Sequence, residues 1–65
     1  MFKNLNAEQA RFDMSNADVA EKLGITRQTY ELKKANGKFT LAEVRTLCQM
    51  FDCGFDYLFE VKEKP

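Results

Sequence analysis

The sequence predicts an all-α single domain of four or five short helices, and three observations support this prediction. Capping patterns recur at short intervals, each with a serine or threonine at the expected start of a helix. Apolar residues then follow at spacings of three and four, as on one face of a helix. No alternating run of β-branched residues interrupts these patterns, so the sequence contains no strand signal.

Length and composition limit what such a chain can be. At 65 residues it is near the lower limit for a domain that folds on an apolar core alone, and 45% of its residues are hydrophobic. Two cysteines are too few for a disulfide scaffold, and the absence of histidine leaves a zinc site short of ligands. We expect one domain over residues 1–65, without metal or other cofactor. Because no leader-like or membrane-spanning apolar run is present, we expect it in the cytoplasm.

The first expected helix covers about residues 3–13, with Leu5 and Ala10 facing inward. The second has a clearer start, because Ser15 can cap its first backbone amides and the aspartate three positions later completes a capping box. Apolar residues follow at helical spacing until Gly24. Glycine readily adopts the left-handed backbone conformation that ends a helix.

The same pattern restarts directly after this glycine. Thr26 is the next predicted cap, Ile25 and Tyr30 can staple the new helix to the core, and Asn36-Gly37 is a strong stop signal. Two helices joined by a three-residue turn with a glycine have helix-turn-helix geometry, in which the second helix is presented to the major groove of DNA. We place the core of this unit at about residues 16–35.

Two further helices complete the prediction. A capping box at Thr40 and Glu43 starts one of them, and its apolar stripe consists of Leu41, Val44, Leu47, Cys48 and Phe51. Cys48 is therefore expected to be a buried thiol that packs as a small hydrophobe. A short last helix is expected at Phe55 to Phe59, followed by a charged tail at about residues 60–65 that frays.

Charge is unevenly distributed although the formal net charge is zero. Residues 27–38 contain four basic side chains and one acidic one, whereas the segments on either side are each net acidic. A local basic segment can direct a phosphate backbone to one face of a protein. On charge alone, a solvated helix face that happens to be basic is the alternative interpretation.

Nearly the whole chain, from Leu5 to Phe59, resembles the phage repressor and Cro type of helix-turn-helix domain, the lambda-repressor-like class. The matching pieces are "NL" at residues 4–5, "SNADVAEKLGITRQTY" at 15–30, "NGK" at 36–38 and "FDYLF" at 55–59. The resemblance implies a five-helix fold and sequence-directed binding to double-stranded DNA, usually as a dimer on a two-fold site.

The resemblance also implies which residues contact DNA. It places base-reading positions on Asn16, Arg27, Gln28, Thr29 and Leu32. Arginine can make two hydrogen bonds to guanine and glutamine two to adenine, while threonine and leucine can contact a thymine methyl group. Phosphate contacts are expected from Thr26, Lys33, Lys34 and Lys38. The alternative for Arg27 and Gln28 is that both are merely solvated residues of a first helical turn.

The sequence departs from the family pattern beside these positions. Many relatives pair a glutamate just before Asn-Gly with an arginine of the first helix, but here those places hold Lys34 or Ala35 and Gln9. Lys33 occupies a position that is apolar in the family. The path of the chain after the third helix is therefore not fixed by the resemblance.

Two functions of different classes fit the sequence. The first is a DNA-binding transcriptional regulator, a prophage-type repressor or Cro-like protein, that binds an operator as a homodimer through the region of Phe55 to Phe59. The second is a protein-interaction module of the antitoxin or anti-repressor kind. An enzyme is not expected, because the sequence lacks histidine, a glycine-rich phosphate loop and a nucleophile near a base. No membrane partner and no small-molecule substrate are expected.

Overall fold

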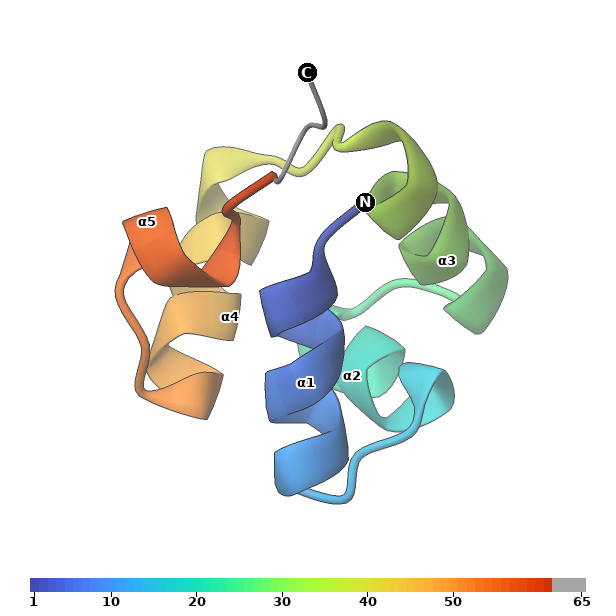
Figure 1. Cartoon of the computed structure of the whole chain (residues 1–65). Helices are drawn as coiled ribbons and strands as arrows, with labels where there is room; N and C mark the ends of the chain where they lie inside the picture. Colours follow the sequence, from blue (N-terminus) through green and yellow to red (C-terminus); the bar gives the residue numbers. More distant parts are fainter. Residues whose placement is uncertain (62–65) are drawn as a thin grey trace.

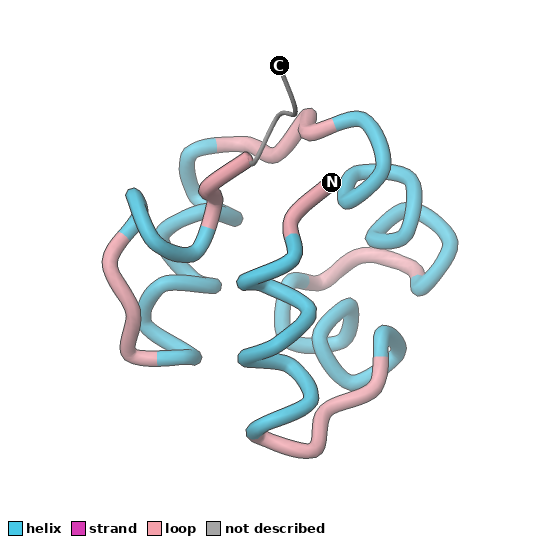
Figure 2. Tube along the Cα trace, in the orientation of Figure 1, coloured by secondary structure: helices cyan, strands magenta, loops and turns pink. Residues whose placement is uncertain are grey.

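The structure is a computed structural model that describes residues 1–61. Its elements are α1 (Lys3–Arg11), α2 (Asn16–Leu23), α3 (Arg27–Asn36), α4 (Leu41–Phe51) and α5 (Phe55–Leu58). The part of the chain described contains no strand, and the all-α prediction is confirmed (Figure 2). In Figure 1, α1 lies in the centre, with α2 and α3 on one side of it and α4 and α5 on the other.

Local capping explains where the helices begin and end. Ser15 and Thr40 each form a complete capping box with the acidic residue three positions later, as predicted. Thr26 caps α3 by accepting a hydrogen bond from the backbone N–H of Thr29 at 3.1 Å. Gly24 ends α2 with φ at 73°, a left-handed conformation that strains residues with a Cβ atom. The resulting three-residue turn directs α3 away from α2.

All five helices contribute to one apolar core. Its buried members are Phe2, Leu5, Val19, Ala20, Tyr30, Leu47, Phe51 and Leu58. Tyr30 is fully buried on the inner face of α3, and its ring centroid lies 6.2 Å from that of Phe39. Ile25 packs against the same core from the turn. The predicted staple is therefore confirmed, and α3 is fixed to the core by a large aromatic side chain.

The inner face of α1 differs from its prediction. The helix ends two residues earlier than expected, before Asp13, whose φ is 54°. Ala10 is exposed, whereas Glu8 and Gln9 are buried. Residues three and four positions after Leu5 share its face, but a residue five positions later lies about 140° around the helix. The prediction that Ala10 faces inward was wrong for this reason.

The apolar stripe of α4 is only partly buried. Leu47 and Phe51 belong to the core, Val44 and Cys48 are half-buried, and Leu41 is 74% exposed. Helical side chains lean towards the amino end of their helix, so the first residue of α4 extends past the core that covers the later turns. The prediction that Leu41 faces inward was wrong. Partial burial raises the pKa of the Cys48 thiol.

The last helix is tied to the first. It begins after Gly54 and ends at Leu58, one residue before the predicted end. The Tyr57 hydroxyl donates to the Glu8 carboxylate at 2.9 Å, and the Asn4 amide donates to the Tyr57 backbone oxygen at 2.8 Å. The predicted fraying of the tail falls largely on residues 62–65, which lie outside the described residues. Within residues 1–61, no helix has the length and apolarity needed to cross a membrane.

Candidate nucleic-acid interface

Four of the five residues predicted to read bases are exposed side chains of α3. Arg27, Gln28 and Thr29 are exposed, and Leu32 is 63% exposed. Gln28, Thr29 and Leu32 are spaced one, three and four positions apart, so they share one side of the helix. Tyr30 fixes the opposite side to the core. Arg27 lies about 60° around the helix from Tyr30 and is exposed at the first position of α3. We call these four exposed side chains the α3 row: Arg27, Gln28, Thr29 and Leu32.

Arg27, the first residue of α3, is paired within its own helix. Its Nη1 donates to Oε2 of Glu31 at 2.9 Å, and the same oxygen accepts a bond from Nδ2 of Asn16 at 3.0 Å. The bond from Asn16, assisted by the charge of Arg27, keeps the pKa of Glu31 below its usual value although partial desolvation opposes this. The carboxylate therefore stays ionised beside the arginine at neutral pH.

Asn16, the fifth predicted base reader, is half-buried at the start of α2. Its Oδ1 accepts bonds from Nε2 of Gln9 at 2.8 Å and from Nζ of Lys34 at 2.9 Å. Its Nδ2 donates to Glu31, which leaves one Nδ2 hydrogen without a partner in this network. Asn16 can therefore donate one bond to a further acceptor, but its oxygen is occupied.

Lys34 lies against α1 and α2 and does not extend into solvent. Its Nζ donates to Oδ1 of Asn6 at 2.8 Å, to Oδ1 of Asn16 at 2.9 Å and to Oε1 of Gln9 at 3.4 Å. The ammonium also lies 4.9 Å from the centroid of the Tyr30 ring. Desolvation lowers the pKa of Lys34, although a nearby carboxylate opposes the shift. All three ammonium hydrogens have partners, so none is left for a phosphate unless this network opens.

These contacts explain how the chain departs from the family pattern. Lys34 faces Gln9 across the helix interface, with its Nζ 3.4 Å from Oε1 of Gln9. Gln9 also accepts a bond from the Tyr30 hydroxyl at 2.9 Å. A neutral amide and a lysine thus meet where the resemblance implied an arginine and a glutamate. No buried side-chain nitrogen or oxygen in the described part of the chain lacks a partner.

Lys33 is partly buried and forms an ion pair with a glutamate of α4. Its Nζ lies 3.2 Å from Oε1 of Glu43, with the two side chains 20% and 12% exposed, and it also donates to the backbone oxygen of Lys38 at 3.2 Å. Partial desolvation raises the pKa of Glu43, but the hydrogen bond from the Thr40 backbone N–H and the charge of Lys33 lower it. The net effect is a lowered pKa. The pair links the end of α3 to the start of α4.

The other two predicted phosphate contacts, Thr26 and Lys38, are exposed. They stand before and after α3, whose ten residues span roughly 15 Å. The first turn of α3 contains no acidic residue, whereas α2 has Asp18 and α4 has Glu43 there. The positive end of the α3 dipole is therefore not neutralised within that turn, and an anion is favoured beside it.

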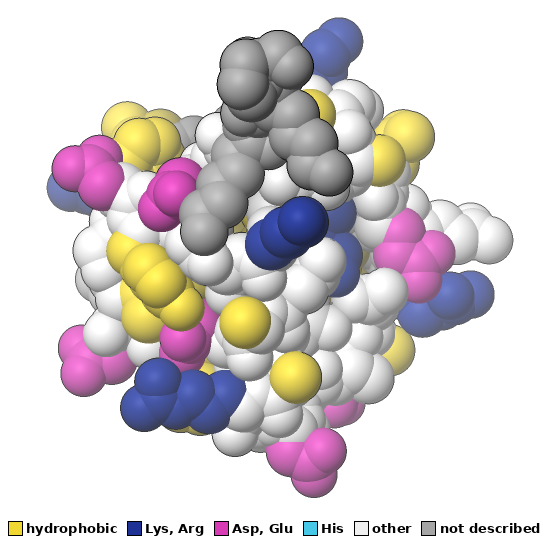
Figure 3. Space-filling view, viewed as in Figure 1, with side chains coloured by type: hydrophobic (Ala, Val, Ile, Leu, Met, Phe, Trp, Pro, Cys, Tyr) yellow, Lys and Arg dark blue, Asp and Glu magenta, His cyan; other side chains and the backbone are white. Residues whose placement is uncertain are grey.

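Acidic and basic side chains are interspersed on the face seen in Figure 3, without a large patch of one sign. This pattern agrees with the formal net charge of zero. Within the described residues, no group of cysteine, aspartate and glutamate side chains could hold a metal ion.

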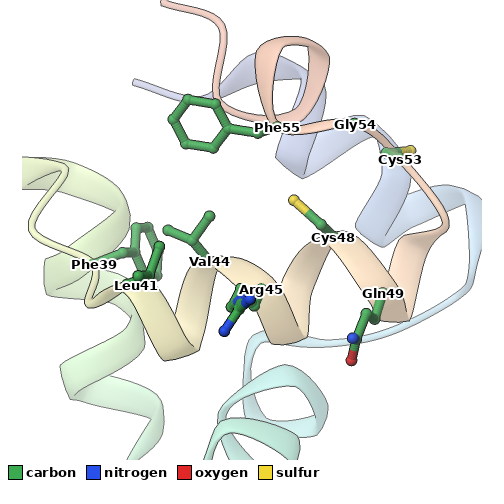
Figure 4. Close-up of a pocket in the computed structure, with 9 residues that line it drawn as sticks. All are labelled: Phe39, Leu41, Val44, Arg45, Cys48, Gln49, Cys53, Gly54 and Phe55. Carbon is green, nitrogen blue, oxygen red and sulfur yellow. The ribbon is translucent and has the colours of Figure 1, made fainter.

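A second surface, the α4–α5 groove, lies on the other side of α1 from the helix-turn-helix. Its volume is about 760 Å³, and it is lined by Phe39, Leu41, Val44, Arg45, Cys48, Gln49, Cys53, Gly54 and Phe55. Figure 4 shows Val44 and Cys48 pointing from α4 towards the ring of Phe55. Leu41 and Phe55 are 74% and 57% exposed.

The sequence predicted only some of the residues that line this groove and only some of those in the polar network around Asn16. It indicated the aromatic side at Phe55, but it placed Leu41, Val44 and Cys48 in the core. The position of Leu41 directly after its cap was the signal for exposure, because a first-turn side chain extends beyond the helix. For the polar network around Asn16, the available signal was that Gln9 and Lys34 stand where the resemblance implied an arginine and a glutamate.

Comparison with known proteins agrees with this architecture. A family model described as a Cro/C1-type HTH DNA-binding domain matches residues 4–64, nearly the whole chain. Searches of curated proteins and of solved structures gave no significant match. The five helices, with α2 and α3 joined by a three-residue turn, fit the family description. The chain therefore belongs to the family of Cro/C1-type helix-turn-helix DNA-binding domains.

Proposed function

We propose that the protein is a sequence-specific regulator of transcription, a prophage-type repressor or Cro-like protein, that places α3 in the major groove of an operator. The observation that carries this proposal is the α3 row. Gln28, Thr29 and Leu32 stand on the side of α3 that faces away from the buried Tyr30, and Arg27 is exposed at the start of the helix. A rigid helix with such a face is what direct readout requires.

Each residue of the α3 row has a chemical role in this proposal. The Arg27 guanidinium has five N–H donors, of which one Nη1 donor is directed to Glu31, so others are free for O6 and N7 of guanine. Gln28 can pair with adenine, and Thr29 and Leu32 can contact thymine methyl groups. Asn16, at the start of α2, adds one donated bond.

The phosphate backbone is held more weakly than the number of lysines suggests. Lys38 is exposed after the end of α3 and can meet a phosphate. The Thr26 hydroxyl already donates to Oγ1 of Thr29 at 2.8 Å, so a phosphate contact there requires the hydroxyl to turn away from Thr29. Lys33 and Lys34 contribute positive potential from partly buried positions, because their ammonium groups already have protein partners. We therefore expect non-specific affinity to be modest and specificity to depend on the α3 row.

Specific binding is proposed to need two copies, joined through the α4–α5 groove. A single module contacts too few base pairs for strong discrimination, and two-fold symmetric half-sites one helical turn apart solve this geometrically. Leu41 and Phe55 leave most of their apolar surface in water in the single chain, and burying it against a second copy would stabilise a dimer. The protein acts in the bacterial cytoplasm in this proposal, without catalysing a reaction.

One observation favours a second candidate, a protein-interaction module of the antitoxin or anti-repressor kind. The groove is apolar and open, while two of the four predicted phosphate contacts are directed into the protein. A partner helix could fill such a groove instead of a second copy.

Selection of bound duplexes from a random pool, followed by a salt titration, separates the two candidates. A regulator should enrich an inverted repeat and lose affinity steeply as salt rises, because several phosphate contacts release counterions. A pool without enrichment, together with no measurable duplex affinity at low salt, would reject the regulator in favour of the protein partner.

A further inference from the structure

The amide of Asn16 has only one possible orientation in its network. On one side it faces the ammonium of Lys34 at 2.9 Å, which can only donate, and on the other it faces the carboxylate of Glu31 at 3.0 Å, which can only accept. The oxygen must therefore point to Lys34 and the nitrogen to Glu31, because the flipped amide would place like groups together at both ends. Gln9 adds a second bond to the same oxygen at 2.8 Å.

This fixed amide controls the position of the Glu31 carboxylate. The Asn16 nitrogen and the Arg27 guanidinium bind the same oxygen of Glu31, Oε2. An exposed ion pair between adjacent helical turns holds its partners poorly, since both side chains stay mobile in water. Here the carboxylate is anchored from α2, which itself is anchored to α1 and to Lys34. The partly buried hydrogen bonds of Asn16 therefore fix the position of the Glu31 carboxylate at the surface of α3.

We propose that Glu31, oriented by Asn16, is a positioning residue that holds the Arg27 guanidinium in one orientation at the front of α3. This inference rests on the proposed function, in which Arg27 reads a base. Glu31 touches no base in this account. Instead it orders the Arg27 side chain before binding, so that less conformational entropy is lost when DNA binds. It also restricts which base pair the guanidinium can reach, which increases discrimination at one position of the operator.

The first test needs no DNA. The ¹⁵N relaxation of the Arg27 Nε–H group in the free protein should show an ordered side chain, compared with the exposed Arg45. Glu31→Ala and Asn16→Ala should each make Arg27 as mobile as Arg45, whereas Glu31→Gln, which keeps an acceptor oxygen, should preserve part of the order. If Arg27 is as mobile as Arg45 in the parent protein, the positioning role is overturned.

The second test is a double-mutant cycle on DNA. Glu31→Ala should reduce discrimination at the base pair read by Arg27 by at least about fivefold and leave the other base pairs unchanged. In an Arg27→Ala background the same substitution should have no further effect. Glu21→Ala, which removes an exposed carboxylate from α2, is the matched control for the change in charge. Thermal melts by circular dichroism check that every variant is folded.

The outcomes of these tests are distinct. Unchanged discrimination in Glu31→Ala, or a loss that persists without Arg27, would contradict the inference while leaving DNA recognition intact. A parent protein that prefers no duplex would instead reject the proposed function. In that case the relaxation of Arg27 still decides whether Glu31 positions it.

Discussion

The α3 row and the α4–α5 groove are supported by the same core but expose opposite chemistry. The row presents hydrogen-bonding side chains such as Arg27 and Gln28, whereas the groove presents apolar ones such as Leu41 and Phe55. Polar base edges in a hydrated major groove suit the first surface, and an apolar protein surface suits the second. The comparison teaches that a domain of 65 residues can carry a polar surface and an apolar surface on opposite sides of α1, and the proposed function assigns DNA reading to the first and assembly to the second.

The largest effect is expected from the residue that fixes α3 to the core. Tyr30→Ala should cost about 3–5 kcal/mol of unfolding free energy, because it removes a fully buried aromatic ring. Both surfaces should then be lost together. Tyr30→Phe keeps the ring and loses the hydroxyl bond to Gln9, so it should cost only about 1 kcal/mol. Urea denaturation followed by circular dichroism measures both, and a Tyr30→Ala variant as stable as the parent would show that the row is held in another way.

The next effect concerns the groove alone. In the proposed dimer, Leu41→Asp should weaken association by about 2–4 kcal/mol, because each protomer would bury a charge in place of an apolar side chain. The stability of the single chain should change by less than about 0.5 kcal/mol, since Leu41 is 74% exposed. Sedimentation equilibrium gives the association constant.

Gln28→Ala is the matched control for this experiment, because Gln28 is exposed on the α3 row and should leave association unchanged. If Leu41→Asp and Gln28→Ala affect association equally, the division of roles between the two surfaces is wrong.

A smaller effect should separate the lysines. Lys38→Ala should weaken binding to all duplexes alike and reduce the magnitude of the salt slope by about one unit, as expected for a phosphate contact. Lys34→Ala should reduce the slope by less, because its ammonium is bound to Asn6, Asn16 and Gln9. It should instead lower stability by removing the hydrogen bonds that join α3 to α1 and α2. Equal slopes for the two variants would mean that the network opens when DNA binds.

The smallest effect is a dependence of stability on pH that involves Glu43. Its pKa in the folded protein is lowered from an ordinary value of 4.5, since the Thr40 N–H and Lys33 stabilise the carboxylate more than partial burial disfavours it. A lowered carboxyl pKa contributes stability that is present above pH 4.5 and is lost as pH falls through the folded value. Thermal melts between pH 6 and pH 3 should therefore show a shallower decline for Glu43→Gln than for the parent. Parallel curves would exclude this contribution.

Sequence patterns predicted the fold well because helix boundaries are set by neighbouring residues. Ser15, Thr26 and Thr40 cap their helices through bonds that span three positions, so the information is local. The positions of the α3 row came from the family resemblance, and the predicted burial of Tyr30 agrees with the exposure of Gln28, Thr29 and Leu32. Local patterns and one strong apolar anchor were enough for these features.

The directions of long polar side chains could not be predicted in this way. Lys34 was expected to be exposed, but its ammonium finds three oxygens contributed by α1 and α2, which only the packing of the helices brings together. Lys33 was likewise expected on the outside, and its partner Glu43 comes from α4. In both cases the deciding contact joins residues of different helices. The roles of these side chains towards DNA stay predictions.

The central claim is that the α3 row reads sequence, and Arg27 and Gln28 test it most directly. Their Ala variants should be compared with the parent on the selected operator and on random duplex at one salt concentration. The account predicts a loss of about 1–3 kcal/mol on the operator for each variant, with almost no change on random duplex. If both variants bind the operator as tightly as the parent, or lose affinity equally on both duplexes, the α3 row does not read bases.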